Sequence, residues 1–273
     1  MERRVTYVVA VKARGTILRD NFLSSPCLET PHSNQILVQE NFKSAAEAYN
    51  DALNKAENDL VVFLHQDVLL PTLWPIELER SLKQLESSDP NWGVLGCYGA
   101  TRTGGHEGRT YSNGFGIIGK ELKHPMPVQT LDEMILIIRK SSGLRFDERL
   151  PYFHLYGADI CLAAARKQQL CYAIPAFCIH NTRRNLILAD EFYDCYRCLK
   201  AIWKEYLPIF TTCIEISKSD FPMYKRRLWE TYLRYVVRRE IGAERAENVR
   251  EVLGSLEATS SMQHTILSAE RQQ

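Results

Sequence analysis

The chain has 273 residues, which suits one large domain with an appendage or two modest domains, since a domain usually has about 100–200 residues. Lys and Arg number 34 and Asp and Glu 33, so the formal net charge is +1. This balance gives no basic field for a nucleic-acid backbone or an anionic membrane. With 45% hydrophobic and 25% charged residues, the chain can bury a core, which argues against disorder, collagen and coiled coil.

The apolar stretch near the N-terminus predicts a strand. Residues Val5 to Val11 are apolar, but the stretch is short and runs into Lys12 and Arg14. A secretory signal would be followed by a small-residue cleavage site. The longest apolar runs, 60–64 and 134–138, are far shorter than the ~20 residues of a membrane helix. We therefore expect a soluble, cytoplasmic protein without a transmembrane segment.

Eight cysteines raise the question of disulfides or zinc. They lack the paired spacing of a zinc ribbon, and the single C-x-x-C, Cys195 to Cys198, lies in a stretch with helical spacing. A redox motif of this kind is expected at a strand-to-helix turn. The pattern favours reduced cysteines in the core of a cytosolic protein.

The first part of the chain alternates between strand and helix patterns, which is typical of an α/β domain. A capping box, Ser44 to Glu47, predicts the start of a helix that runs to about Glu57. The other segments in this part are a strand at Val5–Val11, a helix within Thr16–Leu28, a strand at Gln35–Gln39 and a fully apolar strand at Leu60–Leu64.

The middle of the chain continues this alternation up to about residue 182. We expect a helix from Pro75, a strand at 93–99, a flexible glycine-rich loop at 100–112, strand-like segments at 114–118 and 127–138, a helix at 156–169 and a strand at 171–179. Residues 187–258 have helical spacing and no strand signal. The domain prediction is thus 1–182 for the α/β domain, 183–258 for a helical extension and 259–273 for a frayed tail.

Familiar nucleotide and hydrolase motifs are missing from the sequence. Residues Gly114 to Gly119 match G-x-G-x-x-G, but a polar loop precedes them and two prolines follow by Pro127. A dinucleotide site needs a strand before this motif and a helix starting within it. Walker A, H-E-x-x-H and G-x-S-x-G sequences do not occur.

Polar residues follow the apolar strand that ends at Leu64. His65 and Asp67 are two residues apart, so on an extended chain they point the same way and could address one cation or phosphate. The carboxyl ends of strands are where open α/β sheets place their ligands. An ordinary strand exit, with Asp67 capping the turn, fits the spacing equally well.

Two further polar positions lie at predicted element ends. Asp159 comes near a helix start, where it could also be a first-turn acid. His180 follows the strand that ends at Ile179, and a lone histidine there is more often structural. Together with His65 and Asp67, however, these positions form a more specific signal than any one of them.

Several segments resemble a known family. Residues 44–52 and 59–68 are similar to the donor half of a family-2 glycosyltransferase of the GT-A fold. Residues 156–166 resemble that family's acceptor segment, and 171–180 resemble its strand ending in a histidine. The His-Gln-Asp version is similar to the glycosyltransferase-like branch that includes the streptomycin-biosynthesis StrF-type proteins. The likeness covers about residues 4–182 and implies a GT-A-like sheet flanked by helices.

The resemblance implies a donor site that binds a nucleotide-diphosphate sugar and a divalent cation, Mn²⁺ or Mg²⁺. Asp67 takes the last position of the D-x-D motif and His65 its first, while His180 matches the histidine that completes the metal shell. Imidazole ligands suit Mn²⁺ better than Mg²⁺. The nucleobase is expected over the first two strands, near Val11 and Glu40.

The resemblance also implies an acceptor site. Asp159 matches the catalytic-base aspartate, which would activate an acceptor hydroxyl for a single displacement with inversion. Ala158 and Cys161 replace two acids of the family pattern. A nucleotide-sugar-binding protein without turnover therefore stays open beside the glycosyltransferase, as does a structural partner protein.

The partners expected are a nucleotide-diphosphate sugar, a hydroxyl acceptor of unknown identity and no nucleic acid. Aromatic residues of the helical extension, Tyr193, Tyr196, Trp203 and Tyr206, fit core packing, an acceptor wall or a homo-oligomer interface.

Overall fold

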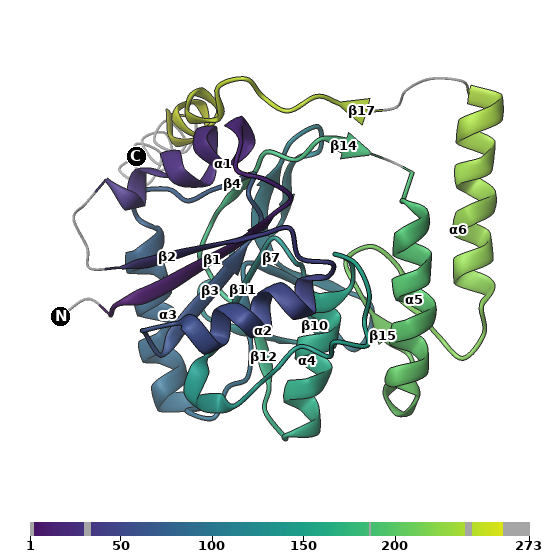
Figure 1. The fold of residues 1–273 in the computed structure, drawn as a ribbon, viewed down its shortest axis with the longest axis horizontal. Coiled ribbons are helices and arrows are strands. Elements are labelled where there is room, and N and C mark those ends of the chain that lie inside the picture. The colour runs from purple at the N-terminus through teal and green to yellow at the C-terminus, as the bar shows by residue number, and fades with distance from the viewer. Residues whose placement is uncertain (1–2, 30–33, 186, 238–241, 259–273) are drawn as a thin grey trace, which may run out of the picture.

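The computed structural model describes residues 3–29, 34–185, 187–237 and 242–258. A twisted central sheet is covered by helices on both faces, and two further helices, α5 and α6, stand to one side of it (Figure 1). The mixed α/β fold with a sheet flanked by helices is therefore confirmed.

The main sheet has seven strands in the order β2-β1-β3-β11-β5-β12-β9. In chain order these are β1 (Val5–Val11), β2 (Gln35–Glu40), β3 (Leu60–Leu64), β5 (Leu95–Gly96), β9 (Met126–Val128), β11 (Ile135–Arg139) and β12 (Cys171–Ala173). Strand β1 pairs in parallel with β2 and β3, and β11 pairs antiparallel with β3. Strand β3 is buried at every residue, as expected for a central strand covered on both faces of the sheet.

A second sheet lies beside the first, in the order β10-β6-β7-β13-β4, with β8 paired to β7. Its strands are β4 (Val68–Leu69), β6 (Tyr98–Ala100), β7 (His106–Ser112), β8 (Gly116–Gly119), β10 (Thr130–Leu131) and β13 (Ile179–His180). The prediction of a flexible loop at 100–112 is wrong from residue 106 onward. Alternate positions of β7 are buried, but they hold Gly108, Thr110 and Ser112, so the alternation carries no large apolar residue. Gly108 has φ +102° and lies so close to the Cys97 carbonyl that a Cβ would overlap it.

Helices cover the sheets and begin largely where the sequence predicts. They are α1 (Thr16–Asp20), α2 (Ala45–Lys55), α3 (Trp74–Ser88), α4 (Tyr156–Arg166), α5 (Asp190–Ile202) and α6 (Phe221–Tyr232). Four short 3-10 helices, η1 (Phe22–Ser24), η2 (Pro26–Leu28), η3 (Lys140–Ser142) and η4 (Lys204–Tyr206), and a π-helical turn, η5 (Leu233–Val237), complete the set. Residues 249–258 are also helical. At α2 the Ser44 hydroxyl accepts a hydrogen bond from Glu47 N, as the capping box predicts. In the described part of the chain, no helix is both long and apolar enough to cross a membrane.

The region after residue 183 also contains short strands. Strand β14 (Arg184–Asn185) pairs with β17 (Gly242–Ala243), and β15 (Ile209–Phe210) pairs with β16 (Glu215–Ile216). The expectation of helices without strands is wrong here, because two-residue strands are too short for a periodic pattern to show.

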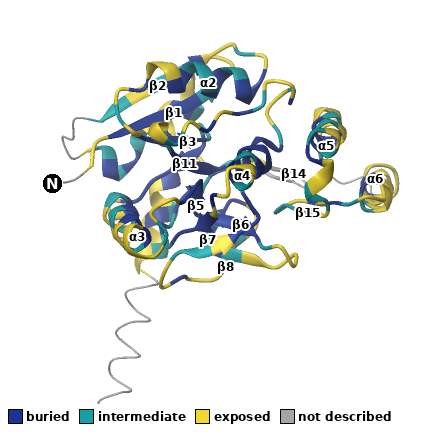
Figure 2. Cartoon of the chain, turned by 90° about the horizontal axis from the view of Figure 1, so that it is seen from below, coloured by how far each residue is buried: buried dark blue, intermediate teal, exposed yellow. Residues whose placement is uncertain are grey.

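Two hydrophobic cores pack against opposite faces of the main sheet. One lies under α1 and α3, and the other joins α2, α4 and α5 to the sheet (Figure 2). Tyr193, Tyr196 and Trp203 belong to the second core, as core packing predicts. The boundary at residue 183 stays a prediction, and the tail at 259–273 lies outside the described residues. All eight cysteines are free thiols.

Candidate functional site

Two histidines and an aspartate meet at the edge of the sheets. His65 follows β3, Asp67 precedes β4, and His180 ends β13, which pairs antiparallel with β4. His180 Nε2 lies 3.3 Å from Asp67 Oδ1 and 3.3 Å from His65 Nδ1. One ligand atom of each residue lies within 4.8 Å of the others. The structure thus brings together three of the residues singled out from the sequence, here called the His-Asp-His cluster.

The orientation of His65 fits a metal ligand. Its Nε2 lies 2.7 Å from the Tyr156 hydroxyl, and that hydroxyl donates its single proton to the Glu133 carbonyl. When the hydroxyl proton points to the Glu133 carbonyl, the matching tautomer of His65 carries its proton on Nε2 and turns the Nδ1 lone pair toward the cluster. A ligating histidine is commonly held through its second nitrogen in this way. The donor set, two imidazole nitrogens and a carboxylate oxygen, suits Mn²⁺ better than Mg²⁺.

The three ionisable groups of the cluster shift one another's pKa values. Burial would raise the pKa of Asp67, but hydrogen bonding to His180 and Arg245 and the nearby positive charges hold it well below its usual range. Burial also opposes protonation of His180, yet Asp67 outweighs it and raises the pKa of that imidazole. Burial and the neighbouring His180 lower the pKa of His65 to about 4. His65 is therefore neutral near pH 7, as a metal ligand must be.

An arginine from the far end of the chain contacts the same carboxylate. Arg245 Nη2 and Nε donate to Asp67 Oδ2 at 3.0 and 3.3 Å. The segment that carries it is held to the sheet edge by Asn181, whose amide accepts from Ala246 N at 2.7 Å and donates to Ala246 O and to Asn21. Sequence reasoning missed Arg245, because 178 positions separate it from Asp67 and no local pattern joins them.

A cavity of about 600 Å³ opens on one side of the cluster. His65 and Asp67 line it together with residues at or after the ends of β1, β2 and β3, on α2 and around the start of α4: Ala10, Val11, Lys12, Asn41, Phe42, Tyr49, Gln66, Phe153 and Tyr156. Val11 lies where the donor-site prediction puts it. Glu40, by contrast, is exposed and forms an ion pair with Arg14 at 2.8 Å, so the structure does not bring it to this cavity.

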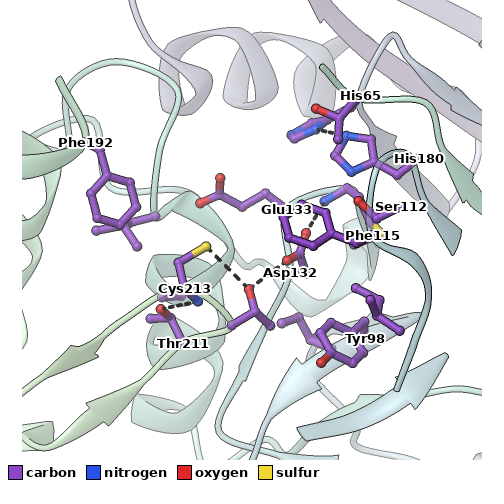
Figure 3. Close-up of a pocket in the computed structure, with 17 residues that line it drawn as sticks. His65, Tyr98, Ser112, Phe115, Asp132, Glu133, His180, Phe192, Thr211 and Cys213 are labelled. Atoms are coloured by element: carbon purple, nitrogen blue, oxygen red, sulfur yellow. Dashed lines mark hydrogen bonds between the residues drawn. The ribbon is translucent and has the colours of Figure 1, made fainter. Parts of the chain in front are cut away.

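A second cavity, of about 390 Å³, opens on the other side. Figure 3 shows Glu133 pointing into it between the two histidines and Phe192. The other lining residues include Tyr98, Phe115, Asp132, Thr211, Thr212 and Cys213. His65 and His180 also line this cavity, so the His-Asp-His cluster lies between the two hollows.

Glu133 is the carboxylate of the second cavity that is suited to proton transfer. Its Oε1 lies 3.5 Å from Gly157 N, at the N-terminus of α4. Burial and the neighbouring Asp132 raise its pKa to about 8, although backbone N–H groups of the helix start oppose this. The adjacent Asp132 carboxylate accepts hydrogen bonds from Thr212 Oγ1 and Met134 N. The sequence does not predict either acid as a site residue, because both lie within the strand-like run 127–138. The pair of acids that interrupts this apolar run is the signal that could have identified them.

Asp159, the predicted catalytic base, is fully buried. Its Oδ1 accepts from Trp203 Nε1 at 2.8 Å and its Oδ2 from Asp147 N at 2.8 Å. Burial raises its pKa to about 6. Because both oxygens are occupied and neither cavity is lined by this residue, the geometry favours Glu133 for contact with a substrate.

The fold and the sheet-edge site together define an α/β protein of the GT-A fold. Among solved structures, the chain is similar to GalNAc-T7, solved with UDP, GalNAc and Mn²⁺, with a TM-score of 0.52 and 11% sequence identity over 86% of this chain and 56% of that chain. It also matches S. aureus TarS (residues 1–349) in complex with UDP-GlcNAc, with a TM-score of 0.49 and 12% identity over 85% and 73% of the two chains.

Sequence comparison gives a relative without a stated activity. The chain is 31% identical over 148 residues to "ATP synthase subunits region ORF 6" of Fuscovulum blasticum, covering 52% of this chain and 58% of that protein. No protein-family model matches the chain. The matches thus span little more than half the length of both this relative and GalNAc-T7.

Proposed function

We propose that this protein is a glycosyltransferase that moves a sugar from a nucleotide-diphosphate donor to a hydroxyl acceptor with inversion and with the help of a divalent cation. The observation that carries the proposal is the His-Asp-His cluster, which lies between two cavities at the edge of a GT-A sheet. The resemblance to family-2 glycosyltransferases and their StrF-type branch supports it.

The cavity at the first strands is the proposed donor site. A nucleoside diphosphate leaves readily when a cation neutralises the charge that develops on it, and this is the chemistry a bound Mn²⁺ or Mg²⁺ supplies. Asp67, His180 and His65 would hold that cation. GalNAc-T7, which shares the fold, was solved with UDP and Mn²⁺. Val11 would lie against the nucleobase and Lys12 would face the phosphates, since both line this cavity.

The second cavity is the proposed acceptor site. The acceptor hydroxyl needs one carboxylate base on the face opposite the leaving group. Glu133 suits this role because it points into the cavity (Figure 3) and its raised pKa makes it a strong base once ionised. The resemblance implies Asp159 as the base instead. That carboxylate would first have to break its hydrogen bond with Trp203 Nε1 or with Asp147 N.

A second candidate is a nucleotide-sugar-binding protein without turnover. The observation that favours it is the guanidinium of Arg245 on Asp67 Oδ2, which already supplies positive charge where a metal would. This candidate predicts nucleotide binding that does not need a metal.

The donor site is tested by thermal unfolding with UDP, GDP, dTDP and CDP, each with and without Mn²⁺. A ligand at about 100 times its dissociation constant stabilises the folded state by about 2.7 kcal/mol. We expect a metal-dependent rise in Tm with one diphosphate, lost in Asp67→Asn and kept in Asp51→Asn, whose carboxylate pairs with Lys55 away from the site. A rise without metal favours the second candidate, and no rise with any nucleotide contradicts both.

A further inference from the structure

Helix α6 and the turn η5 that continues it present an apolar face to solvent. The exposed residues of this face are Phe221, Tyr224, Leu228, Trp229, Tyr232, Tyr235 and Val236, here called the aromatic stripe, and their exposure is between 47% and 73%. Phe221, Tyr224, Leu228, Tyr232 and Tyr235 recur every three or four residues and so lie on one side of the helix, with Trp229 and Val236 next to this row. Figure 2 shows α6 at the outside of the molecule, beside α5 and away from the sheets.

The helix is attached to the body through polar residues. Glu230 is buried and accepts hydrogen bonds from the Tyr193 hydroxyl at 2.7 Å and from Arg226 at 2.8 Å. Met223 and Leu233 pack on the same side. The α6 segment thus turns its buried carboxylate inward and its aromatic residues outward, the reverse of an ordinary surface helix. A contiguous exposed patch of this kind marks an interaction surface.

The exposed charged side chains of α6 and η5 themselves are all basic. Between residues 221 and 237, Glu230 is the single acid, and it is buried. Lys225, Arg227 and Arg234 are exposed along the segment, and of these Arg227 pairs with Asp190 of α5 at 3.4 Å. The net charge of +1 for the whole chain predicts no anionic partner. It does not show this local excess of positive charge, because acids elsewhere in the chain cancel it.

These charges help to decide whether a second copy of the chain or a lipid surface covers the aromatic stripe. In a twofold dimer the same patch faces itself, so Lys225 and Arg234 would face a surface that carries the same two cations. An anionic lipid surface instead complements them. Trp and Tyr prefer the headgroup level of a membrane, and the stripe contains Trp229 stacked on Tyr232, with centroids 5.6 Å apart. Long basic side chains can keep their charge in the headgroups while their stems follow the apolar face.

We propose that α6 and η5 form an interfacial helix that binds the surface of a membrane containing anionic phospholipids. The helix would lie in the membrane plane with the aromatic stripe among the headgroups and upper acyl chains. The proposal does not depend on the glycosyltransferase activity. It would place the acceptor cavity near a lipid surface, since Phe192 of α5 lines that cavity and α5 packs against α6.

The test uses the full chain and vesicles of phosphatidylcholine with or without about 30% phosphatidylglycerol. We expect flotation with the anionic vesicles and at least about tenfold weaker binding to pure phosphatidylcholine. The variant Leu228→Ser, Trp229→Ser, Tyr232→Ser should lose about tenfold or more of the binding. The matched control Leu73→Ser, Ile76→Ser changes two exposed apolar residues near the start of α3 and should bind like the wild type.

Two further measurements secure the result. The Lys225→Glu, Arg234→Glu variant leaves the stripe intact and should also lose most binding to anionic vesicles, so the proposal stays testable if the serine variant fails to fold. Trp229 is exposed, whereas Trp74, Trp92 and Trp203 are at most 2% exposed, so vesicle binding should shift tryptophan emission to the blue.

Three outcomes overturn the proposal. They are no flotation with anionic vesicles, equal loss of binding in the α3 control, and light scattering that shows a dimer which the serine variant converts to a monomer. The last outcome would assign the stripe to a second copy of this chain.

Discussion

The guanidinium of Arg245 donates to the carboxylate of Asp67 across 178 positions of the chain, with Nη2 3.0 Å from Oδ2. The other carboxylate oxygen, Oδ1, faces His180 at 3.3 Å. Asp67 is thus shared between a cluster that can bind a cation and a side chain that is itself a cation. A cation bound at the His-Asp-His cluster would compete with Arg245 for the charge of this carboxylate.

The first prediction follows from this competition. Replacing Arg245 by alanine removes a positive charge beside the cluster, so Mn²⁺ alone should bind about tenfold more tightly. Titration of Mn²⁺ by calorimetry or electron paramagnetic resonance measures it. Arg250→Ala is the control, since Arg250 lies on the same segment but contacts Ser24 and Glu29. Weaker Mn²⁺ binding in Arg245→Ala would mean that Arg245 instead holds Asp67 in its binding position.

The second prediction separates the two candidate bases by pH. If Glu133 is the base, kcat/KM should rise about tenfold per pH unit and level off near pH 8, because burial and Asp132 raise its pKa to about 8. A base at Asp159 would level off near pH 6, since burial raises the pKa of that carboxyl to about 6. Once a donor and an acceptor are known, the pH–rate profile decides. A plateau already reached by pH 6 would contradict the role of Glu133.

The third prediction concerns stability and needs no substrate. The pKa of Glu133 is about 8 in the folded chain against an ordinary value of 4.5, so the folded state holds a proton that the unfolded state has released. Its stabilising effect is complete below pH 4.5 and is lost as the pH rises through 8. Glu133→Gln should therefore gain about 4 kcal/mol relative to the wild type between pH 5 and pH 9, at about 1.4 kcal/mol per unit from pH 5 to pH 8. Urea unfolding at both pH values checks this, and an equal difference at the two would contradict it.

The fourth prediction concerns Asp159. Trp203→Phe removes the indole N–H that donates to Asp159 Oδ1 at 2.8 Å and leaves a buried carboxylate short of a partner. We expect a loss of about 2 kcal/mol in the free energy of unfolding. Trp229→Phe makes the same change at an exposed tryptophan and should cost little. Similar losses in both variants would show that Asp159 does not depend on this hydrogen bond.

The sequence predicts best where the signal is local. Strands β1 and β3 and the start of α2 could be located because an apolar run or a capping box fixes each of them within a few residues. Strand β7 could not, since its buried positions hold Gly108, Thr110 and Ser112 and glycine there serves close packing of strands. A strand of two residues such as β15 has no periodicity at all.

The residues of the site also differ in whether a local sequence signal identifies them. His65, Asp67 and His180 could be found because each follows or ends a strand, and ends of neighbouring strands meet in space. Arg245 and Tyr156 reach the cluster through tertiary contacts that no spacing encodes. The roles given to Val11, Glu40 and Asp159 stay predictions; of these three, the structure brings Val11 to a cavity of the site.

Asn181 joins the cluster to the end of the chain. It directly follows His180, and its side-chain oxygen accepts the backbone N–H of Ala246, the neighbour of Arg245. A ligand that displaces Arg245 from Asp67 removes one contact that holds this segment to the sheet edge, so we expect the Ala246 hydrogen bond to open more often. The hydrogen-exchange rate of one amide proton, that of Ala246, then reports whether the His-Asp-His cluster is occupied. Occupancy can be followed in this way without turnover, a label or knowledge of the acceptor.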